Sequence, residues 1–222
     1  FSSGAVCQNT ANKRIGDVEF ICYQAFNDKV IDRVEFTRRK KKKGEVKSKD
    51  FLKEEEIKKL LLTPMAHKPI KRWFLFSCFS GLAFKECQLL YWHQINDYND
   101  HSVIKYTRSK TSKEYTLRIN KTARKQLGER KNANEKVFPV LTKTNTLYKN
   151  LQKWVDDANI NKQISPHCGR VTFAGLYYDK TKDPIMLMKV MGHKDFKTTM
   201  RYIKKFQDTS EQIMPEFEFS EI

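Results

Sequence analysis

The spacing of apolar residues separates a first helix from a longer remainder. Residues 10–33 repeat apolar side chains at intervals of three and four, the spacing of one helix face. This stripe consists of Ile15, Val18, Ile21, Cys22, Ala25, Phe26 and Val30, with Thr10 placed as an N-cap. Little downstream is available to cover it, so we expect the helix to belong to a domain whose first part precedes Phe1.

From residue 51 the pattern predicts a second, mainly helical domain. Residues 51–62 (FLKEEEIKKLLL) place acidic residues before apolar ones, which suits the helix dipole. Residues 103–119 (VIKYTRSKTSKEYTLRI) alternate apolar and polar positions around a basic middle, as a β-hairpin does. Further helices are expected at about 70–80, 84–92, 120–128, 144–158, 165–180, 183–192 and 198–206. The predicted fold class is therefore mainly α with a small antiparallel β-sheet.

The net charge of the chain indicates which kind of partner it binds. The 222 residues include 43 Lys and Arg against 26 Asp and Glu, a net charge of +17. Such an excess indicates a polyanionic partner, most often nucleic acid, although a basic protein without one has the same balance. A basic run cannot pack into a core, and it predicts a linker that either contacts DNA phosphates or only joins two domains. The run consists of Arg38, Arg39, Lys40, Lys41, Lys42 and Lys43.

Other classes of protein fit the sequence poorly. No run of about 18 apolar residues predicts a membrane span, and no apolar leader indicates secretion. The five cysteines are scattered without a CxxC pair, which is typical of reduced thiols in a cytoplasmic protein. A zinc site from Cys78, Cys87, His93 and His101 has no familiar ligand spacing.

The segment SPHCGR (165–170) carries a candidate anion site. Ser165 followed by Pro166 is the favoured pairing of N-cap and first helical residue. His167 and Arg170 then share one face near the helix start, where free N–H groups and the dipole favour a phosphate. A capped helix that carries His167 and Arg170 on its surface, without a bound anion, fits the sequence HCGR (167–170) equally well.

In the segment MGHKDFKTTMRY (191–202), Tyr202 follows His193 by nine positions. An unbroken helix would put them on opposite faces. A loop at MGH, followed by a new helix capped by Thr198 or Thr199, lets both side chains face one cleft.

Taken in order, these features resemble the catalytic domain of the tyrosine recombinases, the phage integrase family, and especially the integrases of conjugative transposons. The features are Lys110 in the hairpin, HxxR at 167–170, GH at 192–193 and Tyr202. The resemblance covers roughly residues 51–210, where TFAGLYYDK and MLMKVMGHKDFKTTMRY match the family pattern TFAT…LGH…TT..Y. Residues 10–33 resemble the end of the family's core-binding domain. We therefore expect residues 1–36 to be the remnant of a DNA-binding domain, 37–50 a basic linker, and 51–222 the catalytic domain with a C-terminal tail.

The resemblance implies site-specific cleavage and rejoining of DNA without a metal or other cofactor. Tyr202 attacks a phosphodiester to leave a 3′-phosphotyrosyl link, and its unperturbed pKa of about 10 calls for a base, assigned to His167. Arg170 and His193 stabilise the phosphoryl oxygens, and Lys110 protonates the leaving 5′-oxygen. Double-stranded DNA is the implied partner, contacted by the linker and Arg108. The protein is expected to form a homo-oligomer, a tetramer, on DNA, while a monomer in isolation is compatible.

One position departs from the family pattern. In SGLAFKEC (80–87), Ala83 stands where the family normally has an arginine, while Glu86 matches the acidic residue that follows. We expect the missing cation to come from Lys71, Arg72 or Lys85. Arg72 is favoured because its guanidinium is forked and eleven residues bring it back near the azimuth of position 83.

Two other functions remain open. The absence of an arginine at position 83 fits a DNA-binding relative that no longer cleaves. A type IB topoisomerase uses the same cleavage by a tyrosine and is the other alternative. The tail MPEFEFSEI (214–222) either docks on a neighbouring protomer or stays free.

Overall fold

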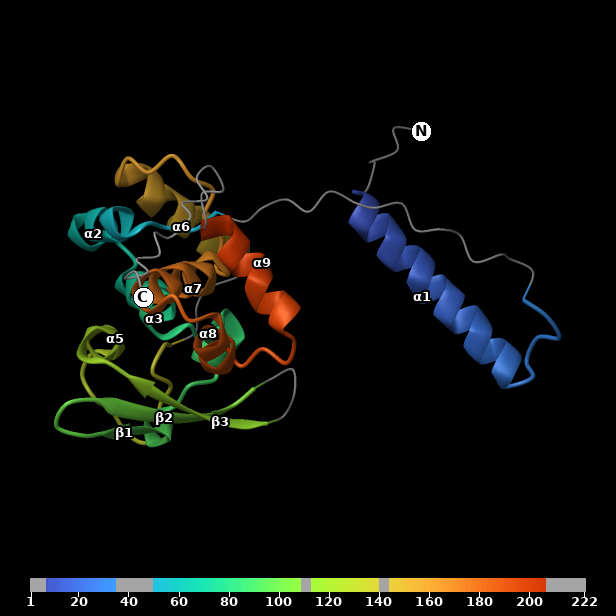
Figure 1. Cartoon of the computed structure of the whole chain (residues 1–222), viewed down its shortest axis with the longest axis horizontal. Coiled ribbons are helices and arrows are strands. Elements are labelled where there is room, and N and C mark those ends of the chain that lie inside the picture. The colour runs from blue at the N-terminus through green and yellow to red at the C-terminus, as the bar shows by residue number, and fades with distance from the viewer. Residues whose placement is uncertain (1–6, 35–49, 109–112, 140–143, 207–222) are drawn as a thin grey trace, which may run out of the picture. The chain divides into compact units, whose positions relative to one another are not determined.

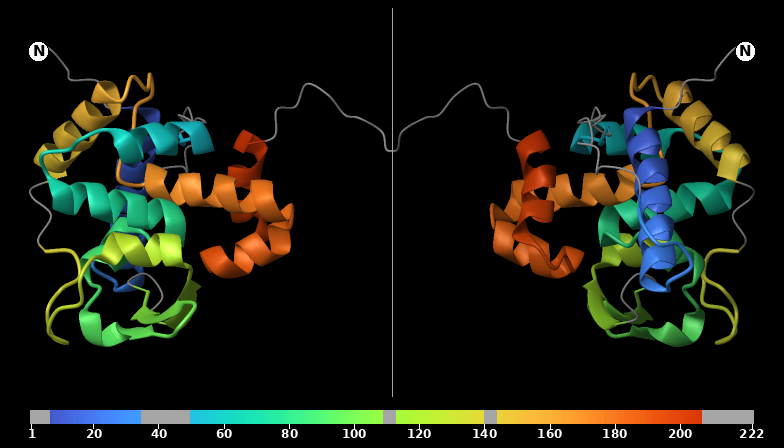
Figure 2. Two further views of the ribbon diagram at one scale, coloured as in Figure 1. Left: turned by 90° about the vertical axis from the view of Figure 1, so that its left-hand side faces the viewer. Right: turned by 90° about the vertical axis from the view of Figure 1, so that its right-hand side faces the viewer.

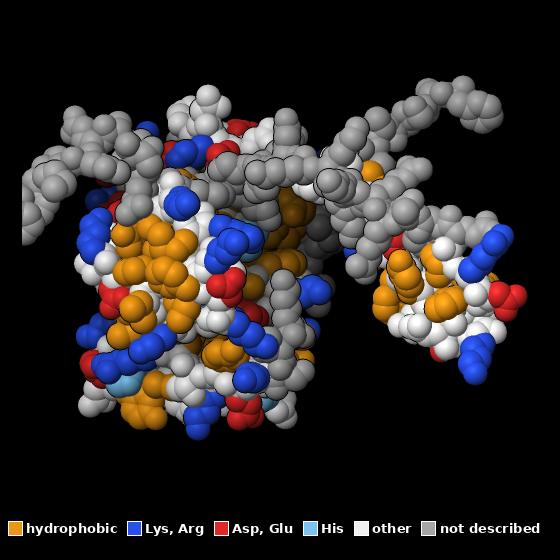
Figure 3. Space-filling view, turned by 45° about the vertical axis from the view of Figure 1, so that its right-hand side comes forward, with side chains coloured by type: hydrophobic (Ala, Val, Ile, Leu, Met, Phe, Trp, Pro, Cys, Tyr) orange, Lys and Arg blue, Asp and Glu red, His pale blue; other side chains and the backbone are white. Residues whose placement is uncertain are grey.

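The computed structural model describes residues 7–34, 50–108, 113–139 and 144–206, in two units divided between Ser48 and Lys49 (Figure 1). The first unit contains helix α1 (Gln8–Asn27). It ends earlier than the stripe predicted, because Lys29 adopts a left-handed backbone with φ of 57° and the Val30 N–H turns back to the Ala25 carbonyl. Its large apolar side chains are exposed, among them Val18, Phe20 and Ile21, as Figure 3 shows for this helix.

The second unit combines helices with one small sheet, which confirms the predicted fold class. The helices are α2 (Glu54–Leu62), α3 (Lys68–Ser80), α4 (Phe84–Gln88), the 3₁₀ turn η1 (Trp92–Gln94), α5 (Lys121–Leu127), α6 (Thr144–Asp157), α7 (Cys168–Thr181), α8 (Pro184–Met191) and α9 (Phe196–Phe206). The strands are β1 (Ile95–Asp97), β2 (Ser102–Thr107) and β3 (Glu114–Ile119). The sheet lies at one end of the unit and the helices lie beside it (Figures 1 and 2).

The sheet has the order β1-β2-β3 with antiparallel pairing throughout. Strands β2 and β3 form the predicted hairpin, with Ile104 opposite Leu117 and Tyr106 opposite Tyr115. The sequence pattern missed β1, since its three residues are too few to show an alternation.

Helix α3 forms the centre of the core. It is apolar on most of its surface, as expected for a helix covered on several sides, and Trp73, Phe74 and Phe76 are fully buried. Each such side chain stabilises the fold by about 1.5–3 kcal/mol. Helix α7 packs along α3, and a Cβ at Gly169 would lie 2.9 Å from Ser77 Oγ. The glycine of HCGR therefore allows the close approach of these two helices.

Three predicted N-caps are wrong. The first is Thr10, because helix α1 begins at Gln8 and has Cys7 as its N-cap. Helix α7 begins at Cys168, because residues 165–168 form a turn in which the Cys168 N–H donates to the Ser165 carbonyl. Helix α9 begins at Phe196 rather than after Thr198 or Thr199, because the Asp195 carboxylate accepts from the Lys197 N–H and caps the first turn. Among the described residues, no helix is long and apolar enough to cross a bilayer.

Candidate active site

Tyr202 lies on α9 between the two histidines that the sequence singled out. Its hydroxyl is 3.3 Å from His167 Nε2, and its ring stacks on His193 with 5.4 Å between centroids and 20° between planes. Burial raises the pKa of Tyr202, while the nearby Arg170 guanidinium partly offsets that rise. The hydroxyl is therefore protonated at neutral pH and has a nitrogen within reach to accept its proton.

His193 is positioned by the end of α8 and by a buried threonine. Gly192 ends that helix with a left-handed φ of 56°, and the His193 N–H donates to the Met188 carbonyl, as in a Schellman motif. The Nδ1 atom of His193 lies 2.9 Å from the hydroxyl of Thr199, which is fully buried. Burial, together with the cations around it, lowers the pKa of His193 to about 4. The imidazole is neutral at pH 7 and acts there as a hydrogen-bond donor or acceptor, not as a charge.

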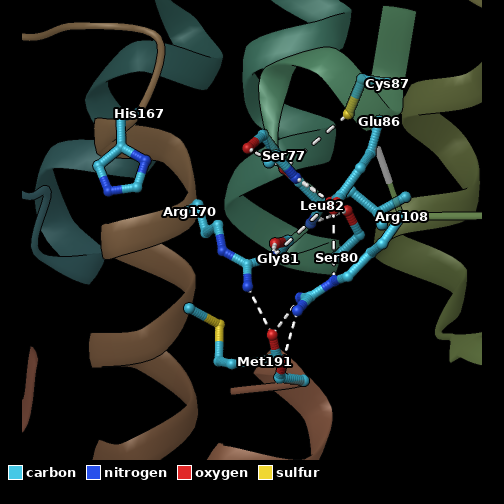
Figure 4. A network of polar contacts seen from close by, with 12 residues as sticks. Ser77, Ser80, Gly81, Leu82, Glu86, Cys87, Arg108, His167, Arg170 and Met191 are labelled. Atoms are coloured by element: carbon cyan, nitrogen blue, oxygen red, sulfur yellow. Dashed lines mark hydrogen bonds and ion pairs between the residues drawn. The ribbon is translucent and has the colours of Figure 1, made fainter. Parts of the chain in front are cut away.

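Arg170 reaches from the first turn of α7 across to α3 and α8. It is 7% exposed and donates to the carbonyls of Gly81 and Met191, each at 2.5 Å (Figure 4). The Glu86 carboxylate lies 3.9 Å away. Burial lowers the pKa of Arg170, an effect that Glu86 opposes. The guanidinium is therefore held at the centre of the site by backbone carbonyls and one carboxylate.

Arg108 enters the same cluster from the end of β2. Its guanidinium donates to the carbonyls of Met191 and Gly192, so that Met191 accepts from both arginines (Figure 4). The Nε atom of Arg108 lies 3.4 Å from Glu86 Oε1, and its Cζ lies 4.9 Å from the ring centre of Tyr115. We expected Arg108 on the DNA-binding surface, whereas it lies in this cluster. Its signal was the strand alternation, which puts residue 108 on the buried face of Ile104 and Tyr106.

The structure does not bring Arg72 to this site. Its guanidinium donates to the carbonyls of Gln126 and Leu127, at the end of α5. Lys71 similarly donates to the carbonyls of Leu61 and Thr63. Residues 72 and 83 do not share an azimuth, because α3 ends at Ser80 and Gly81 adopts a left-handed backbone with φ of 73°. Position 83 therefore no longer follows the helical rotation of residue 72.

Of the remaining predicted residues, only Lys85 lies within the described part of the chain. Lys110, the basic run Arg38–Lys43 and the tail at 214–222 lie outside the described residues. Lys85 is described and is exposed on α4. Within the described part of the chain, no three His, Cys, Asp or Glu side chains gather as a metal site.

The charges of the cluster favour one bound anion. Arg108 and Arg170 contribute two positive charges, Glu86 contributes one negative charge, and His193 is neutral. One positive charge remains beside the hydroxyl of Tyr202, in a partly water-excluded site where electrostatic interactions are strong. A phosphodiester carries one negative charge and offers the two oxygens that a guanidinium fork can hold.

Comparison of the chain with known proteins identifies its family. Residues 50–208 match the model of the phage integrase family. The chain belongs to that family.

Individual relatives agree with the family and with its catalytic-domain fold. The tyrosine recombinase XerA of Saccharolobus solfataricus is 39% identical over 72 residues, which are 32% of this chain and 23% of that protein. The XerH recombinase bound to its difH substrate is 20% identical, with a TM-score of 0.57 over 69% of this chain and 49% of that one. The Tn1549 transposon integrase in complex with circular intermediate DNA is 17% identical, with a TM-score of 0.63 over 89% of this chain and 75% of that one. The chain spans about a quarter of XerA and about half of XerH, and the likenesses to solved structures concern the fold.

Proposed function

We propose that this chain cleaves and rejoins DNA strands through a covalent bond between Tyr202 and a 3′-phosphate. The observation that carries the proposal is the 3.3 Å contact between the Tyr202 hydroxyl and His167 Nε2, beside the buried Arg170 guanidinium. A tyrosine with a raised pKa is a poor nucleophile until it loses its proton. A base and a cationic phosphate site are the two aids it requires.

The proposed step balances as an in-line exchange of two oxygens at phosphorus. The Tyr202 oxygen forms a bond to phosphorus as its proton passes to His167. The bond between phosphorus and the 5′-oxygen breaks, and that oxygen takes a proton from Lys110, the role that the family pattern assigns to it. Attack by a 5′-hydroxyl then reverses the step, so neither a metal nor an external energy source enters the scheme.

The proposed partner is double-stranded DNA. In support, the chain carries a net charge of +17, and Figure 3 shows Lys and Arg side chains around an apolar area on one face of the second unit. We propose that residues 1–36 belong to a core-binding domain, that Arg38–Lys43 contact phosphates, and that a homotetramer forms on DNA. The family resemblance also favours a mobile-element integrase acting on DNA in the cytoplasm.

The test uses duplexes of randomised sequence that carry a nick near the centre. Cleavage beside the nick releases a short fragment and traps the covalent product, which denaturing electrophoresis separates from free protein. We expect an adduct whose modified peptide contains Tyr202, and no adduct from Tyr202→Phe. Tyr148→Phe, an exposed tyrosine on α6, is the matched control and should form the adduct normally. An adduct on any other residue would contradict the proposal.

The alanine at position 83 favours one second candidate, a DNA-binding relative that does not cleave. Retained binding to the duplex pool without an adduct from the wild-type chain would establish that alternative. Relaxation of a supercoiled plasmid of any sequence would instead identify a topoisomerase.

A further inference from the structure

We infer that Arg108 replaces the arginine absent at position 83 and binds the scissile phosphate together with Arg170. This inference rests on the proposed function, and it makes Arg108 a catalytic residue supplied by the sheet rather than by the turn after α3. Four independent observations support it: the contacts of Glu86, the carbonyls at the end of α8, the space left by Gly192 and the charge of the cluster.

Glu86 links position 83 to Arg108. One oxygen of its carboxylate accepts from the Ala83 backbone N–H at 2.8 Å, and the other lies 3.4 Å from Arg108 Nε. Glu86 is itself 9% exposed, and a carboxylate so buried requires cationic partners. The backbone of residue 83 contacts this carboxylate, so an arginine side chain at position 83 would start beside Glu86. Arg108 reaches the same carboxylate from β2.

The end of α8 holds the two guanidiniums together. The last carbonyls of a helix lack partners within the helix and carry the negative end of its dipole. Met191 accepts from both Arg108 and Arg170, and Gly192 accepts from Arg108 (Figure 4). These bonds fix the two like charges side by side without neutralising them.

Gly192 leaves the space that Arg108 needs. A Cβ at this position would lie 2.9 Å from both Cζ and Nη1 of Arg108. The glycine of the GH pair thus serves the arginine as well as the turn that positions His193.

Arg108 is also preorganised for an anion. Its side chain is only 11% exposed, and its guanidinium packs over the Tyr115 ring. Two arginines against one carboxylate leave the cluster one positive charge in excess, which a bound phosphodiester would balance. The pair would further offset the second negative charge that builds up on phosphorus during attack.

The test compares variants on the nicked duplex pool, using the full chain. We expect Arg108→Ala to slow adduct formation by about 10²–10³-fold, the usual cost of removing one preorganised donor. Arg108→Lys should recover only part of the rate, since an ammonium lacks the fork. The double variant Ala83→Arg, Arg108→Ala should regain at least about tenfold over Arg108→Ala, because the guanidinium returns to the same carboxylate.

Arg130→Ala is the matched control. Arg130 also donates to two backbone carbonyls, of Trp92 and Ile95, and pairs with one carboxylate, that of Asp97, which lies beside the start of β2 and therefore at the opposite end of that strand from Arg108. It should form the adduct at the wild-type rate. Thermal unfolding of each variant separates a loss of chemistry from a loss of fold.

A duplex with sulfur in place of the scissile 5′-oxygen separates phosphate binding from proton donation. A thiolate leaves without a proton, so this duplex rescues the loss of a general acid but not the loss of a phosphate ligand. We expect the defect of Arg108→Ala to persist on it. Wild-type cleavage by Arg108→Ala on the normal duplex, or full rescue by the sulfur duplex, would overturn the inference while leaving the proposed function intact.

NMR of a variant that cannot cleave tests phosphate binding by Arg108 directly. In Tyr202→Phe, the Nε–H resonance of Arg108 should shift when the duplex is added, and that of Arg130 should not. A shift at Arg108 with no wild-type adduct would support the anion site and refute the cleavage activity. An adduct from the wild type with no shift at Arg108 would refute the inference alone.

Discussion

The rings of His193 and Tyr202 stack nearly parallel, with 5.4 Å between their centroids, although Tyr202 lies nine positions after His193 in the sequence. The turn at Gly192 and the new helix after Asp195 remove the half-rotation that a continuous helix would impose. His193 thereby contacts Tyr202 and Thr199 and lies near the positive charges of Arg170 and Arg108, so that its protonation is linked to the stability of the fold.

The first prediction concerns the loss of folding stability at acidic pH. The pKa of His193 falls from 6.5 to about 4 on folding, so the unfolded chain binds the extra proton first. The stability present above pH 6.5 is therefore lost as the pH falls toward about 4. A pKa unit is worth about 1.4 kcal/mol, and because the ring is partly exposed we discount the full shift to a loss of about 1–2 kcal/mol. Urea unfolding of the wild type and of His193→Gln across this range measures the effect. Equal pH dependence in both would contradict it.

The second prediction concerns Thr199, which we regard as a positioning residue. Thr199→Val removes the hydroxyl that meets His193 Nδ1 and keeps the shape of the side chain. The imidazole then loses its preferred tautomer and orientation, and we expect adduct formation to fall by about tenfold with a stability loss of about 1–3 kcal/mol. Nitrogen NMR of His193 reports the tautomer directly. Thr198→Val is the control, because the hydroxyl that meets His193 Nδ1 belongs to Thr199 and not to Thr198; an identical effect from both variants would rule out positioning.

The third prediction separates two roles of Gly192. Gly192→Ala combines backbone strain at φ of 56° with a contact of 2.9 Å to Arg108, and should destabilise the fold by about 1 kcal/mol or more. Gly192→Asn tolerates the left-handed backbone better but places the same Cβ against the guanidinium. We expect Asn to restore much of the stability, measured by thermal unfolding, and little of the cleavage. Normal cleavage by the Asn variant would show that Arg108 does not need this space.

The fourth prediction reverses the expectation for Arg72. Its guanidinium holds the carbonyls at the end of α5, so Arg72→Ala should cost about 1–3 kcal/mol of folding stability. The folded fraction should still form the Tyr202 adduct. Denaturant unfolding and the adduct assay, performed on one preparation, give both values. Loss of the adduct in a variant of unchanged stability would return Arg72 to the active site.

The fifth prediction concerns the basic run. Replacing Arg38–Lys43 with glutamine should weaken binding to all duplex sequences alike and reduce the slope of log K against log salt by roughly one unit per lost phosphate contact. Titrations at several salt concentrations measure the slope. A slope equal to that of the wild type would mean that the run only joins two domains.

The sequence by itself determined the mainly helical class, the hairpin and the chain order of HxxR, GH and Tyr202, because these are local patterns of spacing. It could not determine where helices α7 and α9 begin. Ser165 lies in a turn before α7, in which its carbonyl accepts from the Cys168 N–H, and the Asp195 carboxylate caps α9 before Thr198 and Thr199 are reached. Only the tertiary structure decided which cation joins Arg170. Arg72 and Arg108 are equally basic in the sequence, but α5 carbonyls hold the first, whereas Glu86 and the end of α8 hold the second. Long side chains bind wherever folding gathers carbonyls and carboxylates, and those groups come from segments far apart along the chain.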